Sequence, residues 1–212
     1  MVDIAPSVLA AHPLHVHRDV SRLVEAGASI LHLDIMDGDF VPNISFGPAM
    51  VKALRDAFPS LRLDVHLMLS RPDRLLDAFV KAGADEITVH IEAQCDLRKV
   101  IRDLSDAGVV PGLSIKPGTE VHAVSPYFPD IGLVLVMSVE PGFGGQPLMR
   151  ETLDKIPELR GAGFTGTVSV DGGVNADNCA WVASLGATRL VMGTAAFTAA
   201  DPVELFNRCR GL

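Results

Sequence analysis

The chain has 212 residues, a formal net charge of −8 and no basic stretch, so its charge gives no support for binding nucleic acid or an anionic membrane surface. Hydrophobic residues make up 48% of it and aromatic residues 5%, a balance typical of helices packed on a parallel aliphatic sheet. No apolar run approaches the ~20 residues that cross a bilayer. We expect one domain over residues 1–212.

The cysteines and the first residues carry no sign of secretion. Cys95, Cys179 and Cys209 are odd in number and widely spaced, so neither a disulfide framework nor a cysteine zinc site is expected. Residues 1–6 have no basic segment followed by an apolar run, so no signal peptide is expected. We therefore expect a cytoplasmic protein.

Eight short apolar runs predict eight β-strands. In chain order they cover residues 4–9, 30–36, 61–68, 86–90, 109–115, 132–137, 165–170 and 189–192. Helical patterns lie between them, at residues 16–25, 72–81, 97–107, 150–160, 176–185 and 202–209. Strict alternation of strand and helix, without a long linker, favours the α/β class and a closed (β/α)8 TIM barrel over an open doubly wound sheet.

Glycine marks the ends of several helical patterns. A left-handed glycine commonly ends a helix before a buried strand begins. The glycines in such places are Gly27, Gly83, Gly108, Gly163 and Gly186.

Polar residues interrupt the predicted strands near their carboxyl ends, where barrel active sites lie. His32 and Asp34 are two apart in one strand and so share a face. Alternation puts Ser7, His66 and Asp171 of other strands on the same inward face. If the strands are neighbours, the imidazoles and carboxylates converge. Such a set suits one divalent metal ion, Zn²⁺, Fe²⁺, Mn²⁺ or Co²⁺.

Glycine-rich turns follow the last three strands. Glycine lets backbone N–H groups approach a ligand closely, and the loops after strands 7 and 8 are a recurrent phosphate position in barrels. The turns therefore indicate a phosphate held by backbone amides. The absence of a dinucleotide fingerprint and of a Walker A lysine argues against nicotinamide cofactors and ATP. The three turns are residues 140–146, 171–175 and 193–196.

Six segments, in order across nearly the whole chain, resemble the ribulose-phosphate 3-epimerase family. The two longest, residues 32–43 and 137–146, are highly specific, and the second reads Met-Ser-Val-Glu-Pro-Gly-Phe-Gly-Gly-Gln. Ala11-His12 stands where the family usually has Asp-Phe, and Thr194 stands where Ser is usual. The other four matching segments are residues 5–9, 64–68, 87–92 and 170–173.

The resemblance implies a barrel of the ribulose-phosphate-binding type and an isomerase of the pentose phosphate pathway. It implies interconversion of D-ribulose 5-phosphate and D-xylulose 5-phosphate by proton transfer at C3, through an enediolate stabilised by the metal. His32, Asp34, His66 and Asp171 would bind the metal, with Asp34 and Asp171 as acid and base. We also expect a homo-oligomer. Substrate contacts would come from Ser7, His66, Gly142, Phe143, Gly144, Gly145, Asp171, Gly172, Gly173, Gly193 and Thr194.

Three alternative functions compete with this one. The nearest is the same epimerisation of a ketohexose 6-phosphate such as allulose 6-phosphate. Similar enzymes for that sugar tend to alter the glycines that are intact here as Gly145 and Gly173. A sugar-phosphate lyase or decarboxylase would carry a lysine in an Asp-x-Lys-x-x-Asp motif, which residues 34–37 lack. A non-catalytic sugar-phosphate sensor would not need two opposed carboxylates.

Three further interpretations concern residues on the inward face. His90 is interpreted as a hydrogen-bonded core histidine rather than a ligand, and Asp64, one layer deeper, as a structural partner. Methionines that share this face either fill the core or form a dry lid over the intermediate. They are Met36, Met68 and Met137.

Overall fold

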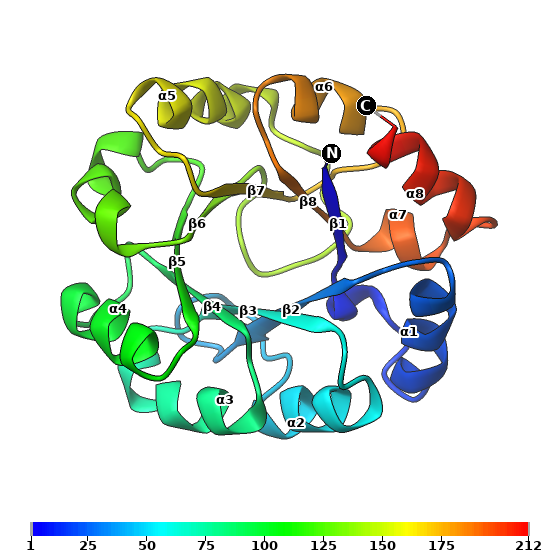
Figure 1. Cartoon of the computed structure of the whole chain (residues 1–212), viewed down its shortest axis with the longest axis horizontal. Helices are drawn as coiled ribbons and strands as arrows, with labels where there is room; N and C mark the ends of the chain where they lie inside the picture. Colours follow the sequence, from blue (N-terminus) through cyan, green and yellow to red (C-terminus); the bar gives the residue numbers. More distant parts are fainter. Residues whose placement is uncertain (1, 212) are drawn as a thin grey trace.

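Eight parallel strands form one sheet in the computed structural model, which describes residues 2–211. The sheet order is β1-β8-β7-β6-β5-β4-β3-β2, and a parallel bridge between Ser7 and His32 joins the remaining pair, β1 and β2. Figure 1 shows the ring of strands with the helices outside it, the predicted (β/α)8 barrel. The strands are β1 (Asp3–Pro6), β2 (Ile30–Met36), β3 (Arg62–Met68), β4 (Glu86–His90), β5 (Val110–Ile115), β6 (Leu133–Met137), β7 (Thr167–Asp171) and β8 (Arg189–Met192).

The helices pack around the strands, and none of those described is long and apolar enough to span a membrane. All five glycines expected to end helical patterns have positive φ, for example +96° at Gly83 after α3. The helices are α1 (Val16–Glu25), α2 (Pro48–Ala57), α3 (Leu76–Ala82), α4 (Leu97–Asp106), α5 (Lys155–Gly161), α6 (Cys179–Ser184), α7 (Thr194–Phe197) and α8 (Pro202–Arg210).

Several elements differ from the sequence-based expectation, and two of them, α2 and α7, lie outside every helical pattern that was expected. The first strand ends at Pro6, not at residue 9, because the Ser7 side chain accepts the Leu9 N–H at 3.3 Å and starts a 3₁₀ turn. Between β5 and β6 there are 3₁₀ turns instead of an α-helix. Pro126 and Pro129 lie in the second of these turns and lack the N–H groups that an α-helix needs.

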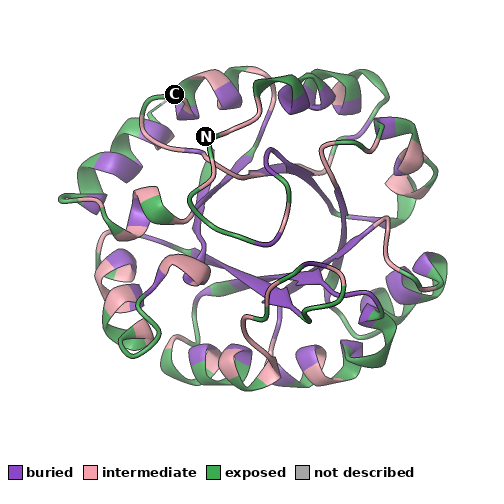
Figure 2. Ribbon diagram, turned by 180° about the vertical axis from the view of Figure 1, so that it is seen from behind, coloured by how far each residue is buried: buried purple, intermediate pink, exposed green. Residues whose placement is uncertain are grey.

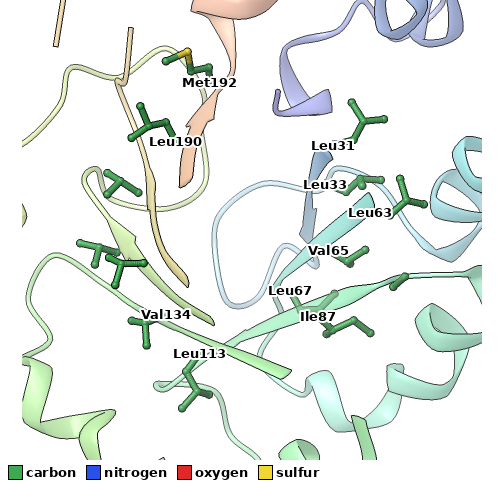
Figure 3. Packing of buried hydrophobic residues seen from close by; sticks show 14 of the residues in the cluster. Leu31, Leu33, Leu63, Val65, Leu67, Ile87, Leu113, Val134, Leu190 and Met192 are labelled. Atoms are coloured by element: carbon green, nitrogen blue, oxygen red, sulfur yellow. The ribbon is translucent and has the colours of Figure 1, made fainter. Parts of the chain in front are cut away.

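Alternation along each strand separates two cores. Leu63, Val65 and Leu67 of β3 belong to the large cluster between the strands and the helices (Figure 3). On β6, Val134 and Val136 join this outer cluster, while the alternate residues Leu133, Leu135 and Met137 face the barrel interior. The strands are buried almost throughout, and exposed residues gather on the outer helix faces and the loops (Figure 2). The outer cluster therefore stabilises the barrel and leaves part of the inner face free for polar groups.

Candidate active site

A cavity of about 840 Å³ opens at the carboxyl ends of the strands. Except for His66, every residue expected to contact substrate lies in its wall, from Ser7 of the first loop to Thr194 after β8. His32 and His66 are completely buried beside Asp34. The cavity thus brings the predicted catalytic groups and the glycine turns to one place.

Four predicted ligands meet at the bottom of this region. Ligand atoms of His32, Asp34, His66 and Asp171 all lie within 4.8 Å of one another. Asp34 Oδ1 is 3.2 Å from His32 Nε2 and 3.1 Å from His66 Nδ1. One carboxylate oxygen facing two imidazole nitrogens, with a second carboxylate nearby, is a ligand set that fits a borderline divalent metal ion.

The strand register explains why these groups converge. Asp34 on β2 is paired with His66 on β3, and register partners in a parallel sheet point to the same side. Ser7, bridged to His32, donates its hydroxyl to Asp34 Oδ2 at 2.6 Å. Asp171 enters from the opposite part of the ring, between Met137 of β6 and Val191 of β8.

The two aspartates differ sharply in proton affinity. Burial raises the pKa of Asp34, but His32 and His66 outweigh it and hold the pKa far below its usual value. Burial, and then the negative charge of Asp34, raise the pKa of Asp171 to about 7. Burial lowers the pKa of His32, yet the Asp34 and Asp64 carboxylates raise it well above the usual value. Two carboxylates with widely separated pKa values suit an acid/base pair.

Below the cluster lies a buried ionic network. Asp64 Oδ2 accepts a hydrogen bond from His32 Nδ1 at 2.9 Å and one from Arg189 at 3.3 Å. Arg189 is only 1% exposed and also donates to both carboxylate oxygens of Glu86. Asp64 is therefore a structural partner, as expected. Its partners are the predicted ligand His32 and Arg189, which was not among the residues expected at the site.

His90 is a hydrogen-bonded core residue, as expected, and it lies next to the site. Its ring contacts His66 and the carboxylate of Glu92. Burial lowers the pKa of His90 to about 4, so the ring is neutral at pH 7. Burial raises the pKa of Glu92, but hydrogen bonds from His90, Thr119 and the Lys116 backbone lower it to about 2.

The Gly172-Gly173 turn can be made only by glycine. Both residues have positive φ, +122° and +66°. A Cβ on Gly172 would lie 2.6 Å from Val139, and one on Gly173 would collide with the backbone of Leu148. Nearby, the amide N–H groups of Thr194 and Ala195 make no hydrogen bond within residues 2–211, since the first turn of a helix leaves such donors free. The turn and these donors form a pocket suited to an anion.

The loop after β6 crosses the mouth of the barrel (Figure 1). Gln146 donates from Nε2 to the carbonyls of Glu140 and Phe143, which keeps the loop compact. Asn43, in the loop after β2, donates to the Gly142 carbonyl at 2.8 Å. Phe143 is 56% exposed at the loop surface. Two loops that are far apart in the sequence are therefore joined by this hydrogen bond, and the one after β6 lines the cavity.

Some residues of the cavity wall were missed from the sequence. Asn178 donates to the Gly173 carbonyl and accepts from the Asn175 N–H, which shapes the glycine turn. Two asparagines three apart after a Gly-Gly pair were the available signal. Arg150 and Trp181 also line the wall, with the guanidinium 4.9 Å from the indole ring. Nothing in the local pattern marks these two, because they come from different elements.

The fold and the site together define a TIM-barrel enzyme with a candidate metal centre at the carboxyl ends of its strands. Residues 3–197 match the model of the ribulose-phosphate 3 epimerase family. The chain is 41% identical to ribulose-phosphate 3-epimerase of Bacillus subtilis, over 100% of this chain and 99% of that one. It is 36% identical to the Escherichia coli enzyme of that name, over 98% and 94%. The chain belongs to the ribulose-phosphate 3-epimerase family, and is therefore an isomerase of carbohydrate metabolism.

Solved structures of more distant proteins support the fold. The chain matches 3-keto-L-gulonate-6-phosphate decarboxylase from Vibrio cholerae with a TM-score of 0.76 and 14% identity, over 99% of this chain and 96% of that one. It matches 3-hexulose-6-phosphate synthase from Salmonella typhimurium with a TM-score of 0.75 and 15% identity, over 99% and 97%. At this identity the likeness concerns the barrel alone.

Proposed function

We propose that the enzyme interconverts D-ribulose 5-phosphate and D-xylulose 5-phosphate by inverting C3. The observation that carries this proposal is the convergence of a buried carboxylate, Asp34, and a partly buried one, Asp171, in a cavity that also contains the glycine turns. One end of the cavity wall offers carboxylates that accept a proton, and the other offers backbone amides that donate to a phosphate. A phosphorylated ketose fits both ends, because it has an acidic C–H beside its carbonyl at one end and a phosphate at the other.

The metal site of this proposal consists of His32, Asp34, His66 and Asp171. When bound there, a divalent ion such as Zn²⁺, Fe²⁺, Mn²⁺ or Co²⁺ supplies Lewis-acid stabilisation of the negative charge that develops on the C2 and C3 oxygens. The geometry that supports it is the 4.8 Å cluster of nitrogen and oxygen donors.

Asp34 and Asp171 carry the proton transfer. One aspartate removes the C3 proton to give the enediolate, and the other returns a proton to the opposite face, with the roles exchanged in the reverse direction. Ser7 orients Asp34 through the 2.6 Å hydrogen bond and contacts the substrate. Met36, Met68 and Met137 line the cavity and shield the intermediate from water.

The glycine turns hold the phosphate, with contacts from Gly142, Phe143, Gly144, Gly145, Gly172, Gly173, Gly193 and Thr194. The tight packing of Gly172 and Gly173 supports a pocket of fixed shape and favours the pentulose over a ketohexose 6-phosphate. We further infer that residues 1–212 form one domain and that the enzyme works in the cytoplasm as a homo-oligomer, on a small-molecule substrate.

Turnover in deuterated water tests the mechanism. We expect deuterium at C3 of the product, detected by NMR, and loss of activity in a chelator-treated sample that returns with added metal. Product without label at C3 would contradict proton transfer. A higher kcat/KM for allulose 6-phosphate than for ribulose 5-phosphate would assign the hexulose instead.

A further inference from the structure

A series of hydrogen bonds leads from His66 away from the cavity. His66 Nε2 lies 2.9 Å from His90 Nε2, and His90 Nδ1 lies 3.0 Å from Glu92 Oε2. Both imidazole side chains are completely buried, whereas the Glu92 side chain is 24% exposed. The series connects a predicted metal ligand with the loop that follows β4.

Two donors from the loop after β5 hold Glu92 in place. The Lys116 backbone N–H donates to Glu92 Oε1 at 3.0 Å, and the Thr119 hydroxyl donates to the same oxygen at 2.5 Å. The Lys116 N–H has a fixed direction because it lies in the peptide plane. Glu92 therefore presents its other oxygen, Oε2, to His90.

The carboxylate determines which nitrogen of each ring carries the hydrogen. An ionised carboxylate only accepts hydrogen bonds, so His90 Nδ1 donates to Glu92. In a neutral imidazole the second nitrogen is then an acceptor, so His90 Nε2 accepts from His66 Nε2–H. His66 Nδ1 keeps its lone pair and faces Asp34 Oδ1, 3.1 Å away.

Each direction leaves one imidazole lone pair facing a carboxylate. With His90 Nδ1 donating to Glu92, that contact is the one between His66 Nδ1 and Asp34 Oδ1, which needs no hydrogen when both atoms serve as ligands at the proposed metal site. The opposite direction would place the lone pair on His90 Nδ1 against Glu92 Oε2 at 3.0 Å, where neither a hydrogen nor a proposed metal lies between them. Phe40, whose ring centroid lies 4.7 Å from that of His90, limits rotation of the imidazole away from this contact.

We propose that Glu92, acting through His90, is a positioning residue that selects the Nε2–H form of His66 and so keeps His66 Nδ1 free as a ligand atom. This inference rests on the metal site proposed above. The other predicted histidine ligand, His32, is held by a single direct hydrogen bond, because His32 Nδ1 donates to Asp64. Partners of this kind, which fix the ring and tautomer of a ligating histidine, typically change metal affinity by about 10–100-fold when mutated.

Glu92→Gln reverses the direction of the hydrogen bonds in this series and leaves the size of the side chain almost unchanged. The Lys116 N–H still requires an acceptor, so the amide oxygen of the glutamine faces it and the amide NH₂ faces His90 Nδ1. His90 Nε2 then carries the hydrogen and donates to His66, which shifts the hydrogen of His66 to Nδ1. We expect two results: the Kd for Zn²⁺ rises about 10–100-fold, and ¹⁵N NMR of the metal-free chain shows a smaller share of the Nε2–H form of His66 than in the parent chain.

Two further variants separate this role from simple packing. Thr119→Val removes a donor to Glu92 but leaves the Lys116 N–H, so the tautomer and the Zn²⁺ affinity stay as in the parent chain. In a His90→Phe background the series is interrupted, so Glu92→Gln has no additional effect on Zn²⁺ affinity. Circular dichroism checks that each variant is folded.

The results distinguish this inference from the metal site on which it rests. If the parent chain does not bind Zn²⁺, the metal site is wrong, whatever the tautomer of His66. If the parent binds Zn²⁺ and Glu92→Gln retains both the parent share of the Nε2–H form and the parent Kd, the role of Glu92 is wrong. An effect of Thr119→Val as large as that of Glu92→Gln also contradicts it, because loop packing then explains both.

Discussion

Two groups of side chains share the inside of the barrel, and they differ in what they contribute. One is an apolar cluster formed by Ala5, Ile30, Leu133, Leu135, Met137, Val139 and Val191. The other is a polar network that extends from the buried arginine to the candidate metal site, formed by Glu86, Arg189, Asp64, His32, Asp34, His66, His90 and Asp171.

The division does not follow whole strands. β2 contributes Ile30 to the apolar cluster and His32 to the polar network, two residues further on. β8 contributes Arg189 to the network and Val191 to the cluster. The outer face of the same strands is uniformly apolar. Stability therefore comes mainly from the outer core, and the inner face can place charges at selected positions.

The largest effect should come from removing the charge of either aspartate at the top of the polar network. Asp34→Asn and Asp171→Asn should each leave the fold intact but remove a group that we propose transfers a proton. We expect kcat to fall by about 10³-fold or more, since general acid–base catalysis typically contributes 10²–10⁴-fold and metal binding is weakened as well. Steady-state assays with ribulose 5-phosphate measure this.

Asp177→Asn is the matched control, because the Asp177 side chain is 92% exposed. Its kcat should equal that of the parent chain. An Asp34→Asn or Asp171→Asn variant with more than a tenth of the parent kcat would remove that aspartate from the acid/base pair.

A smaller effect, on stability, should follow from breaking the lower end of the polar network. Arg189→Met removes the buried cation that Asp64 and Glu86 share, and leaves Glu86 only the half-exposed Arg62 at 3.6 Å. Removing one partner of a buried ion pair typically destabilises a protein by about 3–5 kcal/mol. Urea unfolding measures the free energy of unfolding.

The same substitution at Arg18 provides the comparison, because the Arg18–Asp19 pair lies at the surface with the arginine 69% exposed. Arg18→Met should change the stability by less than about 1 kcal/mol. If both variants lose the same free energy of unfolding, the buried network stabilises the barrel no more than a surface ion pair does.

A substitution in the apolar cluster should lower the free energy of unfolding by a similar or smaller amount, without changing the affinity for the metal ion. Leu135→Ala removes buried methyl groups, which typically costs about 2–5 kcal/mol. The Kd for Zn²⁺ should stay at the parent value, measured by titration below the unfolding transition. Leu14→Ala, at a side chain 83% exposed, should change neither quantity. A weaker Zn²⁺ affinity in Leu135→Ala would show that the two groups are coupled.

The sequence predicted the barrel and the place of the site, because both depend on local patterns. His32 and Asp34 had to share a face whatever the neighbouring strand was. The partners of the site residues depend on register and could not be read locally. His90 contacts His66 only because β3 and β4 are adjacent, and Arg189 reaches Asp64 across the interior from β8. The proline-containing 3₁₀ turns before β6 show the same limit, since strict strand–helix alternation implied a helix there although no helical pattern marks that connection.

The closure of the ring has a consequence for when the enzyme can work during its synthesis. Ser7 comes early in the chain, yet its N–H donates to the carbonyl of Met192 at 3.1 Å, and β1 pairs with β8 along its length. A nascent chain on the ribosome has no β8 until residue 192 has been added and has left the exit tunnel. Until then Ser7 lacks this anchor beside Asp34, so catalysis starts only after the two ends of the barrel have met.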